Sequence, residues 1–383
     1  MSARRVLFIG GGGPTGKPVV DGLLARGYEV AVLNSGRRQM EFEGDVELIV
    51  ADPHFEDSLA EALAGRDFDL VFAQYGRVRL IADLLAGRTE RFIALGGMFY
   101  PGWIDPAATT RPAAETGEKK DWTVRYFDGA EAVAETVPLE AVGRFGARVV
   151  ETDQALRWHH LRGDFAVTLL RYPRVYGPRQ PGAAEWSIVR RLLEGRERII
   201  LPDAGLAAHS VLYAENAARI ALACVDHPEI AAGAVLNCAD RDPLTVRRWV
   251  RWIAEAAGRP EVELVSVPTA LAAPSWPYAR FPTTTGHHIL DTSALDAFRL
   301  QLVPTRTGLT RTVQWFLEDP SRGVAVEPQL ADAFDYAQED ALLAVMDRAS
   351  QEIERLGIVP GDMAHPYAHP AAPDSQTPGK DSL

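Results

Sequence analysis

The residues best suited to chemistry form a glycine-rich turn near the amino terminus. The turn reads Gly10-Gly11-Gly12-Gly13-Pro14-Thr15-Gly16 and lies between an apolar run at residues 6–9 and a helical pattern over residues 17–26. At such a strand–turn–helix junction, unpaired backbone N–H groups and the positive end of the helix dipole face a bound phosphate. Glycine lacks a Cβ that would block a diphosphate, and it adopts positive φ readily. We predict a dinucleotide-binding turn here, with a flexible turn that binds nothing as the alternative. The predicted cofactor-binding residues of the turn are Gly10, Gly13, Pro14, Thr15 and Gly16.

The residues after the second predicted strand, residues 28–33, bear on the choice of nucleotide. They read Asn34-Ser35-Gly36-Arg37-Arg38. An acidic residue at this point would bind the adenosine ribose hydroxyls and favour NAD, but none is present. Guanidinium groups suit a 2′-phosphate, so the sequence favours NADP, with NAD as the alternative. Two solvated loop arginines are the other interpretation. We therefore add Asn34, Ser35, Arg37 and Arg38 to the predicted cofactor-binding residues.

Short apolar strands alternate with helices of about ten residues through the first half of the chain, which predicts a doubly wound parallel sheet of the α/β class. Ligands of such sheets collect at the carboxyl ends of the strands. Three further groups of residues follow predicted strands at this edge: Asp52 and Pro53, then Gln74, Tyr75 and Gly76, then Gly96. Of these, Asp52, Pro53 and Gly96 are predicted to line the cofactor site.

Composition excludes several classes of protein. The 383 residues include 47% hydrophobic and 24% charged residues, as expected for a globular protein with a sizeable core. The net charge of −12 argues against a nucleic-acid or membrane-surface partner. No apolar run is long enough to span a membrane, and the first strand follows the amino terminus too closely for a signal peptide. The only cysteines, Cys224 and Cys238, form no CxxC pair, so we expect a cytoplasmic protein without disulfides.

The remaining segments are less regular. Residues 99–139 lack periodicity and contain several prolines, so they form either a substrate-facing lid or a surface loop without a role. The histidine pairs at 159–160 and 287–288 have no further ligand at metal spacing, and we predict no metal site. Residues 329–357 have the pattern of an amphipathic helix, which packs on its own body or forms a homodimer surface. The polar tail at 359–383 is expected to be disordered.

The chain resembles a known family, the extended short-chain dehydrogenase/reductases, and within it the NAD(P)-dependent epimerase/dehydratase group. The resemblance rests on the glycine turn, on Asp52, on the stretch Arg171-Tyr172-Pro173-Arg174-Val175-Tyr176-Gly177-Pro178, and on the residues around 291–293 and 312–315. It covers about residues 4–320. It implies a Rossmann-type domain at residues 1–175, to which some later segments return, and a smaller mixed α/β substrate domain at 176–320. It also implies that Tyr172, Pro173 and Tyr176 lie near the nicotinamide, and that Gln74, Tyr75 and Gly76 line the same half of the cofactor.

The sequence departs from this family at its catalytic positions. The family uses a Tyr-x-x-x-Lys pair on a long helix, in which the lysine lowers the tyrosine pKa for acid/base work. Here the pair falls on Arg144 and Arg148 or on Gly143 and Ala147, and the serine position falls on Gly96. Arginine stays charged and serves poorly as a proton donor, although Arg148 could hold a ribose or a substrate anion.

Another residue must then carry any acid/base step. The candidates for catalysis, beside Arg148, are Tyr100 and Tyr126, with Tyr172 and His209 as further possibilities. The leading hypothesis is an NAD(P)-dependent enzyme that transfers hydride to or from a small hydroxyl- or carbonyl-bearing metabolite. The alternative is an NADP-binding regulatory or sensor protein that has lost catalysis.

Overall fold

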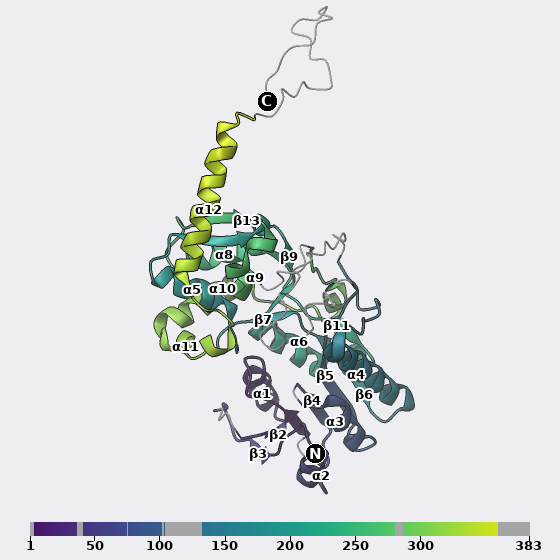
Figure 1. The fold of residues 1–383 in the computed structure, drawn as a ribbon. Coiled ribbons are helices and arrows are strands. Elements are labelled where there is room, and N and C mark those ends of the chain that lie inside the picture. Colours follow the sequence, from purple (N-terminus) through teal and green to yellow (C-terminus); the bar gives the residue numbers. More distant parts are fainter. Residues whose placement is uncertain are drawn as a thin grey trace, which may run out of the picture. The chain divides into compact units, whose positions relative to one another are not determined.

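The computed structural model describes residues 4–36, 41–74, 76–101, 103, 132–279 and 286–358. The chain divides into two compact units, Met1–Ala333 and Phe334–Leu383. The first unit contains the sheet and everything described below except the last helix (Figure 1).

A seven-stranded, fully parallel sheet forms the centre of the first unit, with strand order β11-β6-β5-β4-β1-β2-β3. This confirms the predicted α/β class and Rossmann-type sheet. Six strands come from the first half of the chain, and β11 comes back from the second half to extend the sheet beside β6. The strands are β1 (Arg5–Ile9), β2 (Glu29–Asn34), β3 (Glu47–Val50), β4 (Leu70–Ala73), β5 (Arg91–Gly96), β6 (Ala166–Arg171) and β11 (Val235–Asn237).

Alternate residues of the strands pack against helices on opposite faces of the sheet. Val6 and Phe8 of β1 face one apolar cluster, and Leu7 and Ile9 face another. Such a strand is apolar throughout because both of its faces are covered. The helices of the first half are α1 (Gly16–Leu24), α2 (Glu56–Leu63), α3 (Val78–Leu85) and α4 (Gly143–Arg162).

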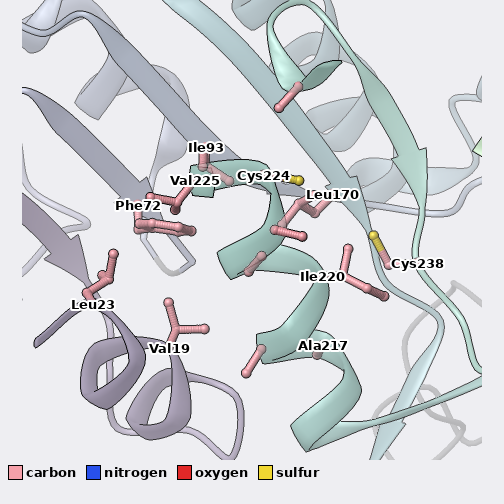
Figure 2. Packing of buried hydrophobic residues seen from close by; sticks show 14 of the residues in the cluster. Val19, Leu23, Phe72, Ile93, Leu170, Ala217, Ile220, Cys224, Val225 and Cys238 are labelled. Carbon is pink, nitrogen blue, oxygen red and sulfur yellow. The ribbon is translucent and has the colours of Figure 1, made fainter. Parts of the chain in front are cut away.

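Helix α6 (Ala214–Asp226) joins the second half of the chain to the sheet. Figure 2 shows Ala217, Ile220 and Cys224 of α6 facing Phe72, Ile93 and Leu170 of the strands, with Val19 and Leu23 of α1 beside them. Helices α1 and α6 pack closely, because a Cβ added at Gly22 would lie 2.3 Å from Leu222 Cδ1. The two halves therefore share one core cluster.

The second half adds small strand pairs and further helices. Strand β7 (Arg174–Tyr176) pairs in parallel with β10 (Val211–Tyr213), β8 (Arg198–Pro202) in parallel with β13 (Glu263–Val267), and β9 (Ala208–His209) antiparallel with β12 (Leu244–Thr245). The helices here are α5 (Ala184–Leu193), α7 (Pro228–Ala231), α8 (Val246–Ala256), α9 (Trp276–Ala279), α10 (Thr305–Glu318) and α11 (Ser321–Val324). The sequence predicts one strand over 209–213, but Ser210 separates β9 from β10.

The last helix, α12, spans Tyr336–Arg355 and begins later than the predicted residue 329. Ala331 and Phe334 have left-handed φ angles of 53° and 48°, which a helix does not accommodate. The Asp335 side chain accepts a hydrogen bond from the Gln338 N–H and caps the helix. The predicted disordered tail at 359–383 lies outside the described residues.

The shared core cluster makes a testable difference between two leucines. Leu23 of α1 is completely buried, whereas Leu271, which follows β13, is 59% exposed. We expect Leu23→Ala to lower the free energy of unfolding by about 2–5 kcal/mol, because it leaves a cavity between α1, α6 and the sheet. We expect Leu271→Ala to change it by no more than about 0.5 kcal/mol. Urea denaturation of both variants measures the difference, and equal losses would contradict the described packing.

Candidate functional site

The glycine turn has the geometry that a diphosphate cradle requires. Gly10 and Gly11 have φ angles of 119° and 80°, which favour glycine. A Cβ added at Gly16 would lie 2.6 Å from Gly11 Cα, so the helix starts against the strand end only because both residues are glycine. A Cβ added at Gly13 would meet nothing within 4 Å, which leaves open space on that side of the turn. The first turn of α1 contains no acidic side chain that would compete with an anion.

A threonine and a glutamine link this turn to the next strand along the sheet. Thr15 Oγ1 donates to Gln74 Oε1 at 3.3 Å, and the Gln74 N–H donates to Ile9 O at 3.1 Å. Gln74 Nε2 is buried and has no hydrogen-bond partner within the described part of the chain. A buried amide donor of this kind is costly unless a ligand or water satisfies it. These observations fit a dinucleotide held across the ends of β1 and β4.

The predicted adenosine end lies at the ends of β2 and β3. Asn34 Oδ1 accepts the Gly36 N–H at 2.8 Å, which turns the chain just past Ser35. Asp52 Oδ1 accepts the His54 N–H at 3.0 Å and lies 2.9 Å from His54 Nδ1. Arg37 and Arg38, which carry the predicted preference for NADP, lie outside the described residues.

Pro53 and Gly76 join the ends of β3 and β4. A Cβ added at Gly76 would lie 2.5 Å from Pro53 Cβ, and Arg77 N donates to Pro53 O at 3.0 Å. Tyr75, which stands between Gln74 and Gly76, lies outside the described residues. The structure therefore brings the other predicted residues of these two strand ends to the edge that also carries the glycine turn.

A buried polar network lies at the ends of β5, β6 and β11. The Tyr100 hydroxyl donates to Asn237 Oδ1 at 2.6 Å and accepts from Arg171 Nη1 at 2.9 Å. Arg171 Nη2 also pairs with Asp153 Oδ1 of α4 at 2.9 Å. Asn237 Nδ2 donates to Val133 O and Asp291 O. The network connects the sheet edge to α4 and to the segment that contains Asp291.

Tyr100 is one of the predicted catalytic residues, and its hydroxyl both donates and accepts a hydrogen bond within this network. Tyr100 is completely buried, and burial raises its pKa in spite of the neighbouring Arg171 guanidinium. The geometry fits a group that positions its neighbours. Arg171 and Asn237 were not predicted as site residues, although a polar side chain that ends an apolar strand is a signal that could have identified them.

Helix α4 carries the positions of the missing catalytic pair. Gly143 begins the helix with a φ of 61°, and Arg144 and Arg148 are exposed. The residues of α4 that approach the sheet edge include Gly146 and Val149: a Cβ added at Gly146 would lie 2.8 Å from Phe99 Cδ1, and one at Gly97 would lie 2.5 Å from Val149 Cγ1. Arg148 lies on a different side of α4 from Gly146 and is not brought together with Tyr100.

The other predicted tyrosines have structural partners or are not described. The Tyr172 hydroxyl donates to Ala217 O at 3.3 Å, and the Tyr176 hydroxyl donates to Asp240 Oδ2 at 2.8 Å. Burial raises the pKa of both hydroxyls well above the usual 10. Pro173 is buried between them, and Gly96 ends β5 opposite Arg171. Tyr126 lies outside the described residues.

The second half contributes a pair of buried histidines. The rings of His209 and His288 lie 5.2 Å apart, and the His288 ring lies 4.9 Å from Trp103, which contacts Tyr100. Burial lowers the pKa of His288 from its usual 6.5 to about 4. Burial, with His288 and Arg174 nearby, also holds the pKa of His209 well below its usual value. Both imidazoles are therefore neutral at pH 7.

The chain matches a model of the NAD dependent epimerase/dehydratase family over residues 125–239. The family resemblance predicted from the sequence is confirmed. A curated relative, the 3-diazoavenalumate denitrifying reductase of a Streptomyces species, is 27% identical over 274 residues, which are 70% of this chain and 86% of the relative. These matches support an NAD-dependent enzyme.

Solved structures of the same group share the fold. A dTDP-glucose 4,6-dehydratase from Bacillus anthracis in complex with NAD gives a TM-score of 0.61 at 14% identity, covering 83% of this chain and 98% of its own. A UDP-glucose 4-epimerase from Thermotoga maritima with UDP-glucose gives a TM-score of 0.62 at 19% identity, covering 82% of this chain and 99% of its own.

Two negative findings concern the described residues alone. Among the described residues, no helix is both long enough and apolar enough to cross a membrane. The described residues also contain no group of three or more His, Cys, Asp or Glu side chains arranged to hold a metal ion.

The Tyr100 network predicts a stability effect. We expect Tyr100→Phe to lower the free energy of unfolding by about 1–3 kcal/mol, because Arg171 and Asn237 each lose a buried partner. Tyr28→Phe is the matched control, since no hydrogen bond of its hydroxyl occurs among the described residues, and it should change stability little. Chemical denaturation measures both. A Tyr100→Phe variant as stable as the control would contradict the network.

The histidine pair predicts a pH effect. Because the folded His288 pKa of about 4 lies below its usual 6.5, only the unfolded chain takes up this proton between the two values. The contribution of His288 to the free energy of unfolding is fully present above pH 6.5 and is lost as the pH is lowered toward 4. The loss is at most about 3 kcal/mol, at about 1.4 kcal/mol per unit of pKa.

The test compares the wild type with His288→Asn. The groups that face His288 are His209, His287 and the Trp103 ring, and His209 changes stability in the same direction. The variant should therefore keep part of the pH dependence and lose the His288 part. Denaturation midpoints measured from pH 7 to 4 report this, and parallel profiles for the two proteins would exclude the assignment.

Proposed function

We propose that this protein is an NAD(P)-dependent oxidoreductase that transfers hydride to or from a small hydroxyl- or carbonyl-bearing metabolite. The observation that carries the proposal is the cradle at the sheet edge: the Gly11–Gly16 contact, the open side at Gly13 and the buried Gln74 amide donor. The curated relative supports the reductive direction, since it is named a reductase.

The chain's own residues would hold the cofactor in sequence along the edge of the sheet. The glycine turn with Pro14 and Thr15 would bind the diphosphate, and the helix dipole of α1 would stabilise its charge. Asn34, Ser35, Asp52 and Pro53 would hold the adenosine half. Residues 74–76, Gly96, Tyr172, Pro173 and Tyr176 would line the nicotinamide half. The nicotinamide, when bound, donates or accepts the hydride.

The acid/base step is the part of the proposal that departs from the family. Tyr100 acts as a positioning residue, because its hydroxyl is hydrogen-bonded on both sides within the Arg171–Asn237 network. Tyr126 and Arg148 remain candidates for contact with the substrate. The variant Tyr126→Phe tests whether Tyr126 is the general acid. A general acid contributes a rate factor of about 10²–10⁴, so loss of this hydroxyl should lower kcat by that factor without weakening cofactor binding.

A second candidate function is an NADP-binding regulatory or sensor protein. The positions of the family's Tyr-x-x-x-Lys pair, which hold no tyrosine and no lysine, favour it specifically. Titration with NADP and NAD, followed by a screen for oxidation of NADPH or NADH over carbonyl and hydroxyl compounds, separates the two. Turnover supports the enzyme, and tight binding without turnover of any compound supports the sensor.

We also propose a homodimer. Helix α4 exposes the large apolar side chains of Trp158 and Leu161, three residues apart on one face, which supports a protein surface rather than water as their surroundings. Light scattering of the purified protein measures the state directly, and a monomer at high concentration would contradict the proposal.

NADP is the proposed cofactor, with NAD as the alternative, and Asn34→Asp tests the choice. Aspartate keeps the side-chain oxygen that accepts the Gly36 N–H, so the local turn should survive. The added carboxylate repels a 2′-phosphate and accepts hydrogen bonds from ribose hydroxyls. We expect the ratio of the NADP to NAD dissociation constants to rise about tenfold or more, which corresponds to about 1.4 kcal/mol.

Calorimetric titration of wild type and variant with both nucleotides measures this ratio. Arg37→Ala and Arg38→Ala should weaken NADP without weakening NAD. A wild type that prefers NAD, or arginine variants that weaken both nucleotides equally, would refute the preference for NADP.

A further inference from the structure

A cavity of about 210 Å³ lies beside the glycine turn, and both halves of the chain line it. Gly13 and Pro14 of the turn line it together with Lys17 of α1. The second half contributes Arg179, from the loop after β7, and Ala214, the first residue of α6. Two predicted cofactor-binding residues therefore share this cavity with an arginine that the sequence did not predict as a site residue.

The loop after β7 is a tight turn that brings Arg179 to the cavity. The Gln180 N–H donates to Gly177 O at 3.3 Å, and a Cβ added at Gly177 would lie 3.1 Å from Ala214 Cβ, so the turn packs on the start of α6. Arg179 is exposed and has a left-handed φ of 68°. Its guanidinium makes no hydrogen bond or ion pair with the described residues. The donors of this group are therefore available to a ligand.

The carboxylates that line the cavity are already paired. Asp21 Oδ2 accepts from Lys17 Nζ at 2.6 Å, one helical turn away. The two oxygens of Glu215 each accept from an arginine that is not among the described lining residues, at 2.7 and 3.0 Å. Lys17 is thus held in place by Asp21, and Arg179 adds a charge that no described carboxylate compensates. This arrangement favours an anionic ligand.

The start of α1 has few backbone donors of its own. A helix amino terminus binds phosphate through its first N–H groups. Here Pro14 and Pro18, which both line the cavity, have no N–H, and the Gly16 N–H donates to Gly13 O at 3.2 Å. The helix dipole still favours an anion, but a bound phosphoryl group needs further donors from side chains.

We propose that Arg179, assisted by Lys17, binds the diphosphate of the nicotinamide nucleotide in this cavity, so that the second half of the chain completes the cofactor site. A guanidinium donates two parallel hydrogen bonds to a phosphoryl group, and the Lys17 ammonium adds a point charge. This inference rests on the proposed function, because it adds residues to the same cofactor site. Inorganic pyrophosphate has the same chemistry as the cofactor's diphosphate and serves as the probe for it.

The test is Arg179→Gly in the full chain, titrated by calorimetry with the nicotinamide nucleotide that the wild type binds, with ADP-ribose and with inorganic pyrophosphate. We expect the dissociation constants of the nucleotide and of ADP-ribose to rise by the same factor, about tenfold or more, because both contain the diphosphate. Pyrophosphate should compete with the nucleotide in the wild type and bind more weakly to the variant. Glycine adopts a left-handed φ without strain, so the urea midpoint should not fall.

Arg299→Gly is the matched control. Arg299 is also exposed, has a left-handed φ of 50° and makes no side-chain hydrogen bond or ion pair with the described residues, but it is not among the described residues that line the cavity. Its replacement should leave all three affinities as in the wild type. Arg179→Lys keeps the charge and loses the second hydrogen bond, so its affinity for the nucleotide should lie between those of the wild type and Arg179→Gly.

Three results would overturn the proposal. The first is equal nucleotide affinity in the two glycine variants. The second is a loss confined to the nucleotide, with ADP-ribose unchanged, because Arg179 would then act on the nicotinamide half. The third is binding of pyrophosphate, dependent on Arg179, to protein already saturated with nucleotide, because the cavity would then hold a separate phosphoryl group.

The same titrations keep this inference apart from the proposed function. If the wild type and both glycine variants bind the nucleotide equally, the proposed function stands and the role of Arg179 fails. If no nicotinamide nucleotide binds the wild type, the proposed function fails. The cavity is then still a phosphoryl site if pyrophosphate binds in a manner that depends on Arg179, and it is not one if pyrophosphate does not bind.

Discussion

The close approach of Gly16 to Gly11 is the contact on which the candidate cofactor site depends. The two backbones touch so closely that a Cβ at Gly16 would lie 2.6 Å from Gly11 Cα. This contact lets α1 begin close to the end of β1, and the first N–H groups of the helix have no partner within the helix itself. Thr15 and Gln74 then join the turn to β4, and Gly76 and Pro53 join β4 to β3. Contacts that begin at the Gly11–Gly16 pair thus link the ends of β1, β4 and β3.

The second half of the chain is held to the same edge by polar contacts within a core. Helix α6 packs on α1 and the sheet, β11 extends the sheet, and Asn237 at its end bonds Tyr100 and the segment that carries Asp291. Because His288 lies three residues from Asp291 in this segment, the buried pair of His209 and His288 is connected to the same network. The Arg171–Asp153 pair is buried, so losing either partner would leave an uncompensated charge at this junction.

The sequence predicted the elements well where the signal is local. The glycine turn, the helix that follows it and the parallel sheet follow from apolar periodicity and turn residues, and the structure agrees with them. The contacts of Tyr100 were not predictable in this way, because its partners Arg171 and Asn237 are 71 and 137 residues away. The predicted start of α12 at residue 329 differs from the observed start for another reason. The left-handed residues Ala331 and Phe334 precede the helix in the structure, but they do not change the apolar pattern that predicted a longer helix.

The positions at which the family's catalytic pair is expected lie in a closely packed part of the structure. Gly97 contacts Val149 so closely that a side chain at residue 97 would collide with α4, and Gly146 has the same relation to Phe99. Gly143 has a left-handed φ of 61°, which a tyrosine would adopt only with strain. A tyrosine at residue 143 would therefore require a change in the backbone at the start of α4. The same loop after β5 carries Tyr100, so the packing of α4 on Gly97 and Phe99 also positions the hydroxyl that bonds Arg171 and Asn237.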